Sequence, residues 1–274
     1  MVREITIGQY YPVDSILHKL DPRVKIVCTL IFLISLFVQN NVTGYLLATI
    51  FLVTVIGLSK VPASFIIRGL KPVLILLLFT GVMNLFFTQG GAVLAHFWVF
   101  TITEKGLRTA VYMSIRLIYL IAGSSLMTFT TTPNALTDGI ETLLNPLNKI
   151  RVPVHEIAMI MSIALRFIPI LLEETDKIMK AQIARGADLE SGNMIQKMKS
   201  MVPILVPLFV SAFRRANDLA MAMESRCYRG GEGRTKMKPL VYESRDRAAY
   251  AITILFFIAM AAGGRILPIH LWIF

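Results

Sequence analysis

The sequence predicts an all-α integral membrane protein with about five transmembrane helices and two long cytoplasmic or interfacial helices. Hydrophobic residues make up 55% of the 274 positions, whereas charged residues make up only 16%. The mean hydropathy is +0.65. Because soluble domains carry about a quarter charged residues, this composition indicates that lipid solvates much of the chain.

Five apolar runs account for this composition, and each is a candidate for a helix that crosses the bilayer. The first run is short for a span and carries one cation, Lys25, whose long side chain can reach the lipid headgroups. The second carries no charge at all. The predicted spans are Val24–Val38, Val42–Leu58, Pro72–Phe87, Leu107–Phe129 and Ala248–Ala262.

The connections between these runs differ in charge. Gln39–Thr43 is uncharged, whereas Lys60, Arg68 and Lys71 surround the next connection. Because basic loops stay in the cytoplasm, we expect the N-terminus inside, the C-terminus outside, and Thr88–Lys105 as an external or re-entrant connection. The same bias explains the net charge of +11 without a nucleic-acid partner, and the chain has no compact basic domain to bind one.

Three regions follow from this pattern. They are a four-helix transmembrane region at 1–130, a cytoplasmic helical region at 131–245 and a C-terminal transmembrane helix at 246–274. Parts of 154–213 are also apolar enough to lie at membrane depth. Cys28 lies in an apolar run and Cys227 in a basic segment, so we expect two free thiols rather than a disulfide.

Two long helices of similar design are predicted in the cytoplasmic region. The first covers about Val154–Arg185, bends near Pro169 and is followed by Gly186, a residue typical of the position after a helix. The second has two prolines near its beginning and ends near Ser225-Arg226-Cys227. Both helices therefore begin apolar, become amphipathic and stop at an arginine.

Arg185 and Arg226 are 41 residues apart, each at a predicted helix end. Exposed carbonyl groups there carry partial negative charge, which favours a cation. A guanidinium group also offers a planar fork of donors that matches a carboxylate on a partner. Two such ends indicate a partner with two similar grooves. The periodicity alone leaves a simpler interpretation open, in which both arginines are solvated and stabilise only their own helices.

Several stretches, in order along the chain, resemble one known family. The chain is similar to the transmembrane T component of energy-coupling factor (ECF) transporters, which import vitamins and metals in bacteria and archaea. Two arginine-centred triplets in this context are a specific signal, whereas one would not be. The matching stretches are Asp14–Lys25, Thr128–Pro133, Ala164–Pro169, Ala181–Asp188 and Glu224–Gly231.

The resemblance implies a coupling subunit in a bacterial or archaeal plasma membrane that takes part in uptake of a vitamin or other micronutrient. It implies two cytoplasmic ABC-type ATPases as partners, together with one small membrane-embedded S component that binds the substrate. The residues implied to contact the ATPases are Ala184, Arg185, Gly186, Ser225, Arg226, Cys227 and Arg229. The residues implied to face the S component are Leu172, Met179, Leu219 and Met223.

One position departs from the family pattern. The second triplet is Ser-Arg-Cys, whereas the family usually has a small residue or glycine in the last place. This departure leaves open which residues beside Arg226 touch the partner, and Arg229 is a candidate to share the contact.

Other function classes lack their expected residues. The chain has no G-x-x-x-x-G-K-[ST] loop, so we expect no ATPase activity and no cofactor in this chain, with ATP bound by the partners. The four histidines are scattered without metal-ligand spacing, so no metal site is expected. A stand-alone secondary transporter or channel is the main alternative, but inverted hydropathy repeats are not evident. An intramembrane enzyme would need reactive residues inside the spans, and those are missing.

For Arg116, within the fourth span, we expect an inward structural pairing rather than a transport role.

Overall fold

The computed structural model describes residues 10–38, 41–88, 90, 93–97, 100–187, 193–231, 237 and 239–266. The chain divides into two compact units. The bundle unit contains Gly8–Ile140 and Leu240–Phe274, and the hairpin unit contains Glu141–Pro239. The hairpin unit is therefore inserted between two segments of the bundle unit. The region boundaries at 130 and 245 were drawn on hydropathy and stay a prediction.

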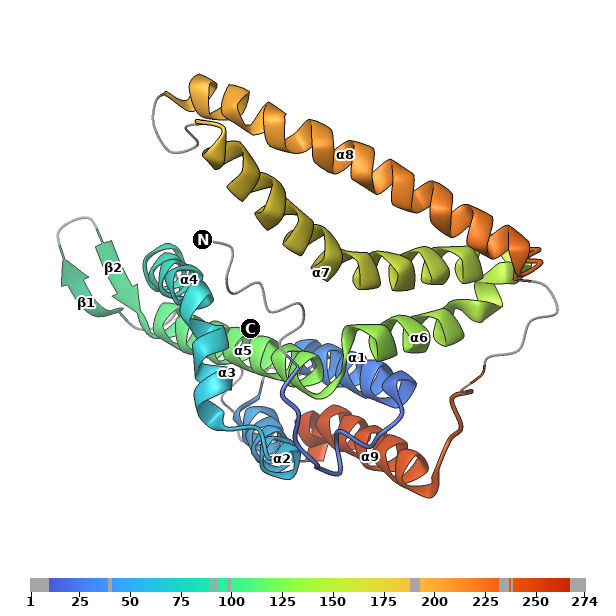
Figure 1. Ribbon diagram of the computed structural model, residues 1–274. Coiled ribbons are helices and arrows are strands. Elements are labelled where there is room, and N and C mark those ends of the chain that lie inside the picture. The colour runs from blue at the N-terminus through green and yellow to red at the C-terminus, as the bar shows by residue number, and fades with distance from the viewer. Residues whose placement is uncertain are drawn as a thin grey trace. The chain divides into compact units, whose positions relative to one another are not determined.

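Helices build almost all of the described chain (Figure 1). The bundle unit holds α1 (Pro22–Val38), α2 (Val42–Ser59), α3 (Ala63–Leu70), η1 (Lys71–Val73), α4 (Leu74–Phe87), α5 (Glu104–Thr130), most of α6 (Pro133–Leu144) and α9 (Ser244–Ile266). The hairpin unit holds η2 (Asn145–Ile150), α7 (Val154–Ala184) and α8 (Met194–Ser225).

Part of the predicted connection between the third and fourth spans is a β-hairpin. Strand β1 (Val93–Phe97) pairs antiparallel with β2 (Phe100–Thr103), and Phe97 is opposite Phe100 in the register. Trp98, in the same connection, lies outside the described residues.

The set of membrane-spanning candidates overlaps the predicted one. By length and composition, the described helices long and apolar enough to cross a membrane are Val42–Ser59, Ala63–Phe87, Glu104–Thr130 and Val154–Ala184. The last of these is α7, whose first half is as apolar as a span. Helix α1 has 17 residues, which gives a length of about 26 Å against a hydrocarbon core of about 30 Å. Helix α9 is longer, but it begins with the polar stretch Ser244–Arg247.

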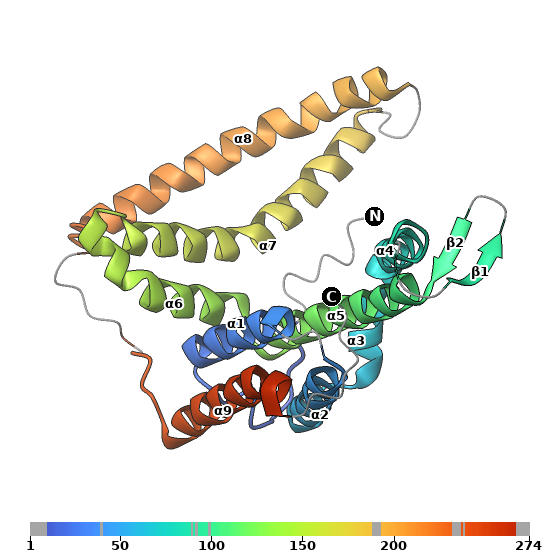
Figure 2. The same cartoon turned by 180° about the vertical axis from the view of Figure 1, so that it is seen from behind.

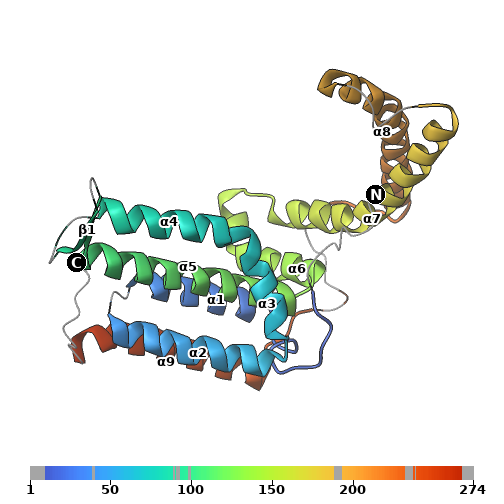
Figure 3. The same ribbon diagram turned by 90° about the vertical axis from the view of Figure 1, so that its left-hand side faces the viewer.

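The core of the bundle unit lies where α1, α2, α5 and α9 meet. Figure 3 shows α5 between α4 and α1, and α9 packs against both α1 and α2. Phe51 stacks on Phe256 with 4.2 Å between ring centroids, and Phe32 joins them from α1. Gly123 lets α5 approach this cluster, because a Cβ atom there would lie 2.6 Å from Cε1 of Phe32.

Arg116 forms the structural pairing predicted for it. Its Nε donates to the Tyr45 hydroxyl at 3.0 Å and so connects α5 with α2. The guanidinium also lies 5.6 Å from the centroid of the Phe37 ring. A charge inside an apolar bundle is costly without such partners.

Four charged residues are buried at the start of α1 and α9. We call Asp21, Arg23 and Asp246 the charged cluster, and Lys25 lies one turn further along α1. Arg23 binds the Asp21 carboxylate with two hydrogen bonds, Nε–Oδ1 at 3.0 Å and Nη2–Oδ2 at 2.7 Å. Asp246 accepts the backbone N–H of Asp21 at 2.9 Å and that of Glu243 at 2.8 Å. The beginning of α1 is thereby joined to the beginning of α9.

The segment before α1 folds back onto the bundle unit. The His18 ring bonds to Ser15 Oγ through Nδ1 at 2.7 Å and to the Tyr11 carbonyl through Nε2 at 2.9 Å. Burial lowers the pKa of His18 below its ordinary value, which favours a neutral ring with Nε2 as the donor. Tyr11 in turn donates its backbone N–H to the Phe129 carbonyl at the end of α5, at 2.9 Å.

We predict that Arg23→Ala lowers the free energy of unfolding by about 3–5 kcal/mol, because it leaves the Asp21 carboxylate buried without its partner. Lys19→Ala is the matched control, since its ion pair with Asp14 is exposed and such pairs contribute only about 0–1 kcal/mol. Denaturant unfolding of the purified chain in detergent micelles measures both changes. Equal effects of the two substitutions would contradict the role given to the charged cluster.

Candidate functional site: the ends of the two long helices

Helices α7 and α8 form the hairpin unit and carry the predicted arginines (Figures 1 and 2). Helix α7 covers Val154–Ala184, as predicted, with Pro169 in its interior. Figure 1 shows that α7 changes direction along its length, which is the usual effect of an internal proline. Helix α8 covers Met194–Ser225.

The beginning of α8 differs from the sequence prediction. The helix begins at Met194, well before Pro203, so both of its prolines lie in its interior. A capping box forms this start: the Asn193 side chain accepts from the backbone of Gln196, and the Gln196 side chain accepts from the backbone N–H of Asn193 at 3.0 Å. An N-x-x-Q spacing was available in the sequence as a signal for this helix start.

Polar contacts join the two helices along their length. Glu174 on α7 accepts hydrogen bonds from Ser211 and from Arg215 on α8, the latter through Nη2 at 2.7 Å and Nε at 3.2 Å. Nearer the turn, Gln182 donates to the Pro203 carbonyl at 3.2 Å. These partners are up to 41 residues apart in sequence, so no local pattern predicted them.

Helix α7 ends in a Schellman motif. Arg185 is the C-cap residue, and Gly186 follows with φ of +86°. The N–H of Gly186 donates to the Ile183 carbonyl at 2.9 Å, and the N–H of Ala187 donates to the Gln182 carbonyl at 3.0 Å. These two bonds are the defining pair of the motif. The prediction that Gly186 ends this helix is therefore confirmed.

Helix α8 ends in the same motif with a different residue in the left-handed position. Arg226 is its C-cap residue, and Cys227 follows with φ of +57°. The N–H of Cys227 donates to the Glu224 carbonyl at 2.9 Å, and the N–H of Tyr228 donates to the Met223 carbonyl at 3.1 Å. Cys227 thus occupies the place that Gly186 has in α7, but it bears a Cβ atom that disfavours this conformation.

The two arginines are equivalent in backbone geometry. The φ and ψ angles are −86° and 5° at Arg185, and −93° and 13° at Arg226. Both side chains are exposed, and neither forms an ion pair with the part of the chain that the structure describes. Each guanidinium is thus available to a carboxylate outside the chain.

The other residues predicted at these ends are exposed as well. Ala184 and Gly186 flank Arg185, Ser225 and Cys227 flank Arg226, and Arg229 lies three residues beyond Arg226. The two ends lie at opposite ends of the hairpin, because α7 stops where α8 begins (Figure 1). With 32 residues in α8, they are separated by about 48 Å.

The ends of α7 and α8 differ in the contacts that surround them. A Cβ atom at Gly186 would meet nothing within 4 Å, whereas one at Gly231 would lie 2.5 Å from Cδ2 of His155. His155 is in the first turn of α7, and its Nδ1 lies 2.9 Å from Oε1 of Glu141. The chain that follows Arg226 therefore packs against the start of α7, whereas Gly186, which follows Arg185, has open space where its Cβ atom would lie among the described residues.

The predicted S-component residues are only partly accessible. Leu172, Met179, Leu219 and Met223 are all half-buried. More exposed apolar side chains lie on the first two-thirds of α8. These are Ile195, Met198, Met201, Val202, Val206, Phe209, Val210 and Phe213, each more than half exposed. Such a patch marks a surface that meets lipid or another protein.

Within the described ranges, no group of three or more His, Cys, Asp and Glu side chains is placed to hold a metal ion.

We predict that Cys227→Gly stabilises the end of α8 by about 1–2 kcal/mol, since glycine adopts the left-handed conformation without the Cβ penalty. The reciprocal change, Gly186→Cys, is expected to destabilise the end of α7 by a similar amount. Hydrogen exchange of the last-turn amides in each helix measures both effects. Unchanged protection in both variants would show that the left-handed residue does not limit these helix ends.

Comparisons with known proteins match most of the chain. A family model described as cobalt transport protein, CbiQ, matches residues 14–237. The chain is 59% identical over 247 residues to the energy-coupling factor transporter transmembrane protein EcfT of Clostridium kluyveri, with 90% of this chain and 92% of that protein covered. It is 53% identical over 271 residues to the EcfT protein of Thermosediminibacter oceani, covering 99% and 100%. It is 48% identical over 255 residues to the EcfT protein of Bacillus subtilis, covering 93% and 96%.

Proposed function

The chain belongs to the family of transmembrane components of energy-coupling factor transporters, and we propose that it couples two cytoplasmic ABC-type ATPases to a substrate-binding S component. The observation that carries this proposal is the pair of equivalent helix ends, each with an exposed arginine as the C-cap residue of a Schellman motif.

The geometry of these ends favours a partner with two equivalent sites. Two guanidinium groups with the same backbone frame, about 48 Å apart along α8, suit two acidic grooves in a dimer of homologous subunits. The chain carries no phosphate-binding loop, so the ATPases bind and hydrolyse the nucleotide. This chain then contributes no catalytic residue and no cofactor of its own.

The S component is proposed to contact the side of the hairpin that bears apolar side chains. The exposed residues of α8, from Ile195 to Phe213, form the larger part of this surface. Leu172, Met179, Leu219 and Met223 are proposed to lie at its border, because they are half-buried. The complex would import a vitamin or another micronutrient across a bacterial or archaeal plasma membrane, with the substrate chosen by the S component.

A stand-alone carrier or channel is the alternative. It would place functional charges along a path within the bundle unit, but the buried charges there serve structural contacts. Arg23 binds Asp21, Arg116 binds Tyr45, and Lys25 donates to the carbonyls of His18 and Thr130. Co-purification distinguishes the two functions, because a coupling subunit retains two ATPases in detergent and a carrier is active alone in liposomes.

We predict that Arg185→Glu or Arg226→Glu weakens ATPase binding and that the double substitution prevents it. A hydrogen bond to a charged group contributes about 1.5–3 kcal/mol, so each single change is expected to raise Kd by about ten- to a hundredfold. Co-purification of tagged chain with the ATPases, together with substrate uptake in vesicles, provides the measurement.

Arg214→Glu is the matched control, since it makes the same charge change at an exposed position of α8 away from both ends. We expect it to leave ATPase binding intact. A double variant of Arg185 and Arg226 that still retains two ATPases and supports normal uptake would refute the assignment.

The proposed orientation, with a cytoplasmic N-terminus, is tested by thiol labelling. The native Cys227 is exposed and is expected to react with a membrane-impermeant maleimide only from the cytoplasmic side. A cysteine at Asn41, introduced into a Cys227→Ser background, is expected to react only from outside. Intact right-side-out cells and inverted vesicles give the two readings, and the opposite sidedness would reverse the topology.

A further inference from the structure

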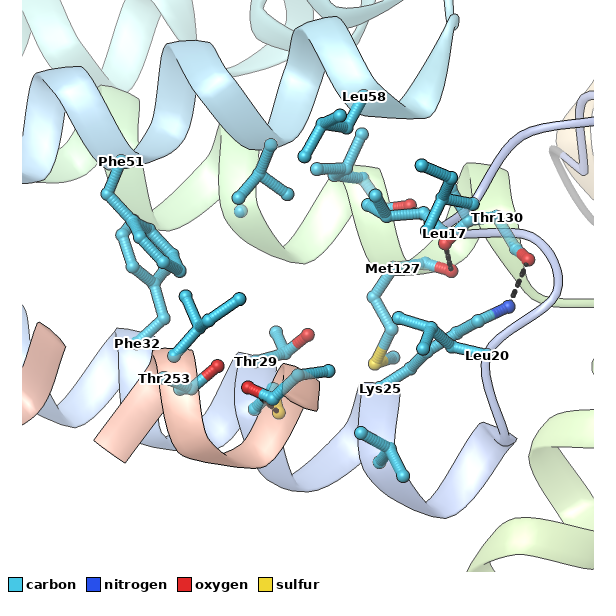
Figure 4. Close-up of a pocket in the computed structure, with 18 of the residues that line it drawn as sticks. Leu17, Leu20, Lys25, Thr29, Phe32, Phe51, Leu58, Met127, Thr130 and Thr253 are labelled. Atoms are coloured by element: carbon cyan, nitrogen blue, oxygen red, sulfur yellow. Dashed lines mark hydrogen bonds between the residues drawn. The ribbon is translucent and has the colours of Figure 1, made fainter. Parts of the chain in front are cut away.

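A cavity of about 290 Å³ lies inside the bundle unit, among α1, α2, α5 and α9. Figure 4 shows Phe32 and Phe51 at one end of it, and Lys25 with Thr130 at the other. Its size is at the lower limit of pockets that hold small molecules, which are about 300–1,000 Å³. The proposed ATPase contacts make no use of this space, since all of its lining residues lie in the bundle unit.

The surface that faces the cavity is mostly hydrocarbon, and two of its polar groups, on Lys25 and Cys28, are turned toward backbone carbonyls. Lys25 Nζ donates to the carbonyls of His18 at 3.1 Å and Thr130 at 2.8 Å, so its methylene groups line the wall. The Cys28 thiol donates to the Ala249 carbonyl at 3.9 Å. A space with such walls favours an apolar occupant over water.

The cavity reaches the outside of the bundle. Three large apolar residues that line it are also exposed: Ile16 at 61%, Leu58 at 46% and Ile252 at 59%. They come from three segments, namely the chain before α1, the end of α2 and the middle of α9. In a membrane-embedded bundle, apolar openings of this kind meet lipid chains.

One cation at this cavity has an unsatisfied donor. Arg245 lines the cavity, and its Nη2 pairs with Glu243 at 2.8 Å. Its Nε is buried and has no acceptor among the residues that the structure describes. The nearby carboxylates are already occupied, since Asp21 binds Arg23 and Asp246 binds two backbone N–H groups. The Arg245 side chain as a whole is 38% exposed, so a headgroup phosphate can pair with its remaining guanidinium nitrogens.

We propose that the cavity holds one acyl chain of a membrane phospholipid, whose headgroup oxygen accepts a hydrogen bond from Arg245. The acyl chain fills a space bordered by side chains that are only half-buried, among them Thr29, Val55 and Met127. The site depends on the membrane location of the bundle and does not depend on ATPase coupling, so either proposal can fail alone.

The first test measures lipid retained by the full chain after purification in dodecyl maltoside. Thr29 points into the cavity, so Thr29→Phe fills it, whereas the neighbouring Leu30→Phe adds the same ring on the exposed outer face of α1. Native mass spectrometry is expected to find about one bound phospholipid in wild type and in Leu30→Phe, and at least about tenfold less in Thr29→Phe. Equal retention in all three, or detergent as the only adduct, would overturn the proposal.

A second test needs no substitution. Cys28 lines the cavity, so its labelling rate reports whether the cavity is occupied. Cys227 is exposed and lies outside the cavity, so its labelling rate is the internal control. Adding phosphatidylglycerol to delipidated chain in dodecyl maltoside is expected to slow the reaction of Cys28 with an apolar maleimide by about tenfold. The rate at Cys227 should not change. Equal Cys28 rates with and without phosphatidylglycerol would overturn the proposal.

Discussion

The charged cluster of Asp21, Arg23 and Asp246 is the interaction on which the bundle unit depends. It joins residues 225 positions apart and fixes the start of α1 to the start of α9. Without it, α9 would be held to α1 mainly by apolar side chains and the long contact of 3.9 Å from the Cys28 thiol to the Ala249 carbonyl. Apolar packing specifies position poorly in a lipid environment. Because both chain ends build the bundle, the α7–α8 hairpin is an insertion whose two connections return to one compact unit.

Charged side chains have different surroundings in the bundle unit and in the hairpin unit. Inside the bundle, three cations are matched closely: Arg23 by a bidentate carboxylate, Lys25 by two carbonyls and Arg116 by a phenol. On the hairpin, Arg185 and Arg226 are exposed at carbonyl-rich helix ends. Buried charges must be paired because desolvation is costly, whereas an exposed guanidinium keeps its binding capacity for another molecule.

The sequence predicted the parts of this protein that local patterns determine. Apolar runs gave the helices of the bundle, and an arginine followed by glycine gave the end of α7 at Gly186. Cys227 could not be predicted as a left-handed residue, because its conformation follows from the hydrogen bonds that close α8 and not from its side chain. The same is true of Glu174 with Arg215 and of Asp21 with Asp246, whose partners are distant in sequence.

The start of α8 was mislocated for a different reason. The sequence predicts that Pro203 and Pro207 lie near the beginning of this helix, yet the capping box at Asn193 starts it well before them. Proline disfavours the interior of a helix by removing one N–H donor, but the rest of a 32-residue helix can compensate for that loss. The sequence predicts an apolar first half for α8, and the structure shows that its side chains, including Met198 and Phe209, are exposed.

The contacts within the hairpin determine how it would respond to its partners. Glu174 accepts hydrogen bonds from Ser211 and Arg215 near the middle of α8. Gln182 donates one to the Pro203 carbonyl near the turn. A change in the distance between the Arg185 and Arg226 ends would require α7 to slide along α8, which would break these bonds together. If the two ATPases approach each other on binding ATP, as coupling requires, the hairpin is therefore expected to move or pivot as a connected pair of helices. Its apolar surface would then transfer that movement to whatever it contacts at the membrane.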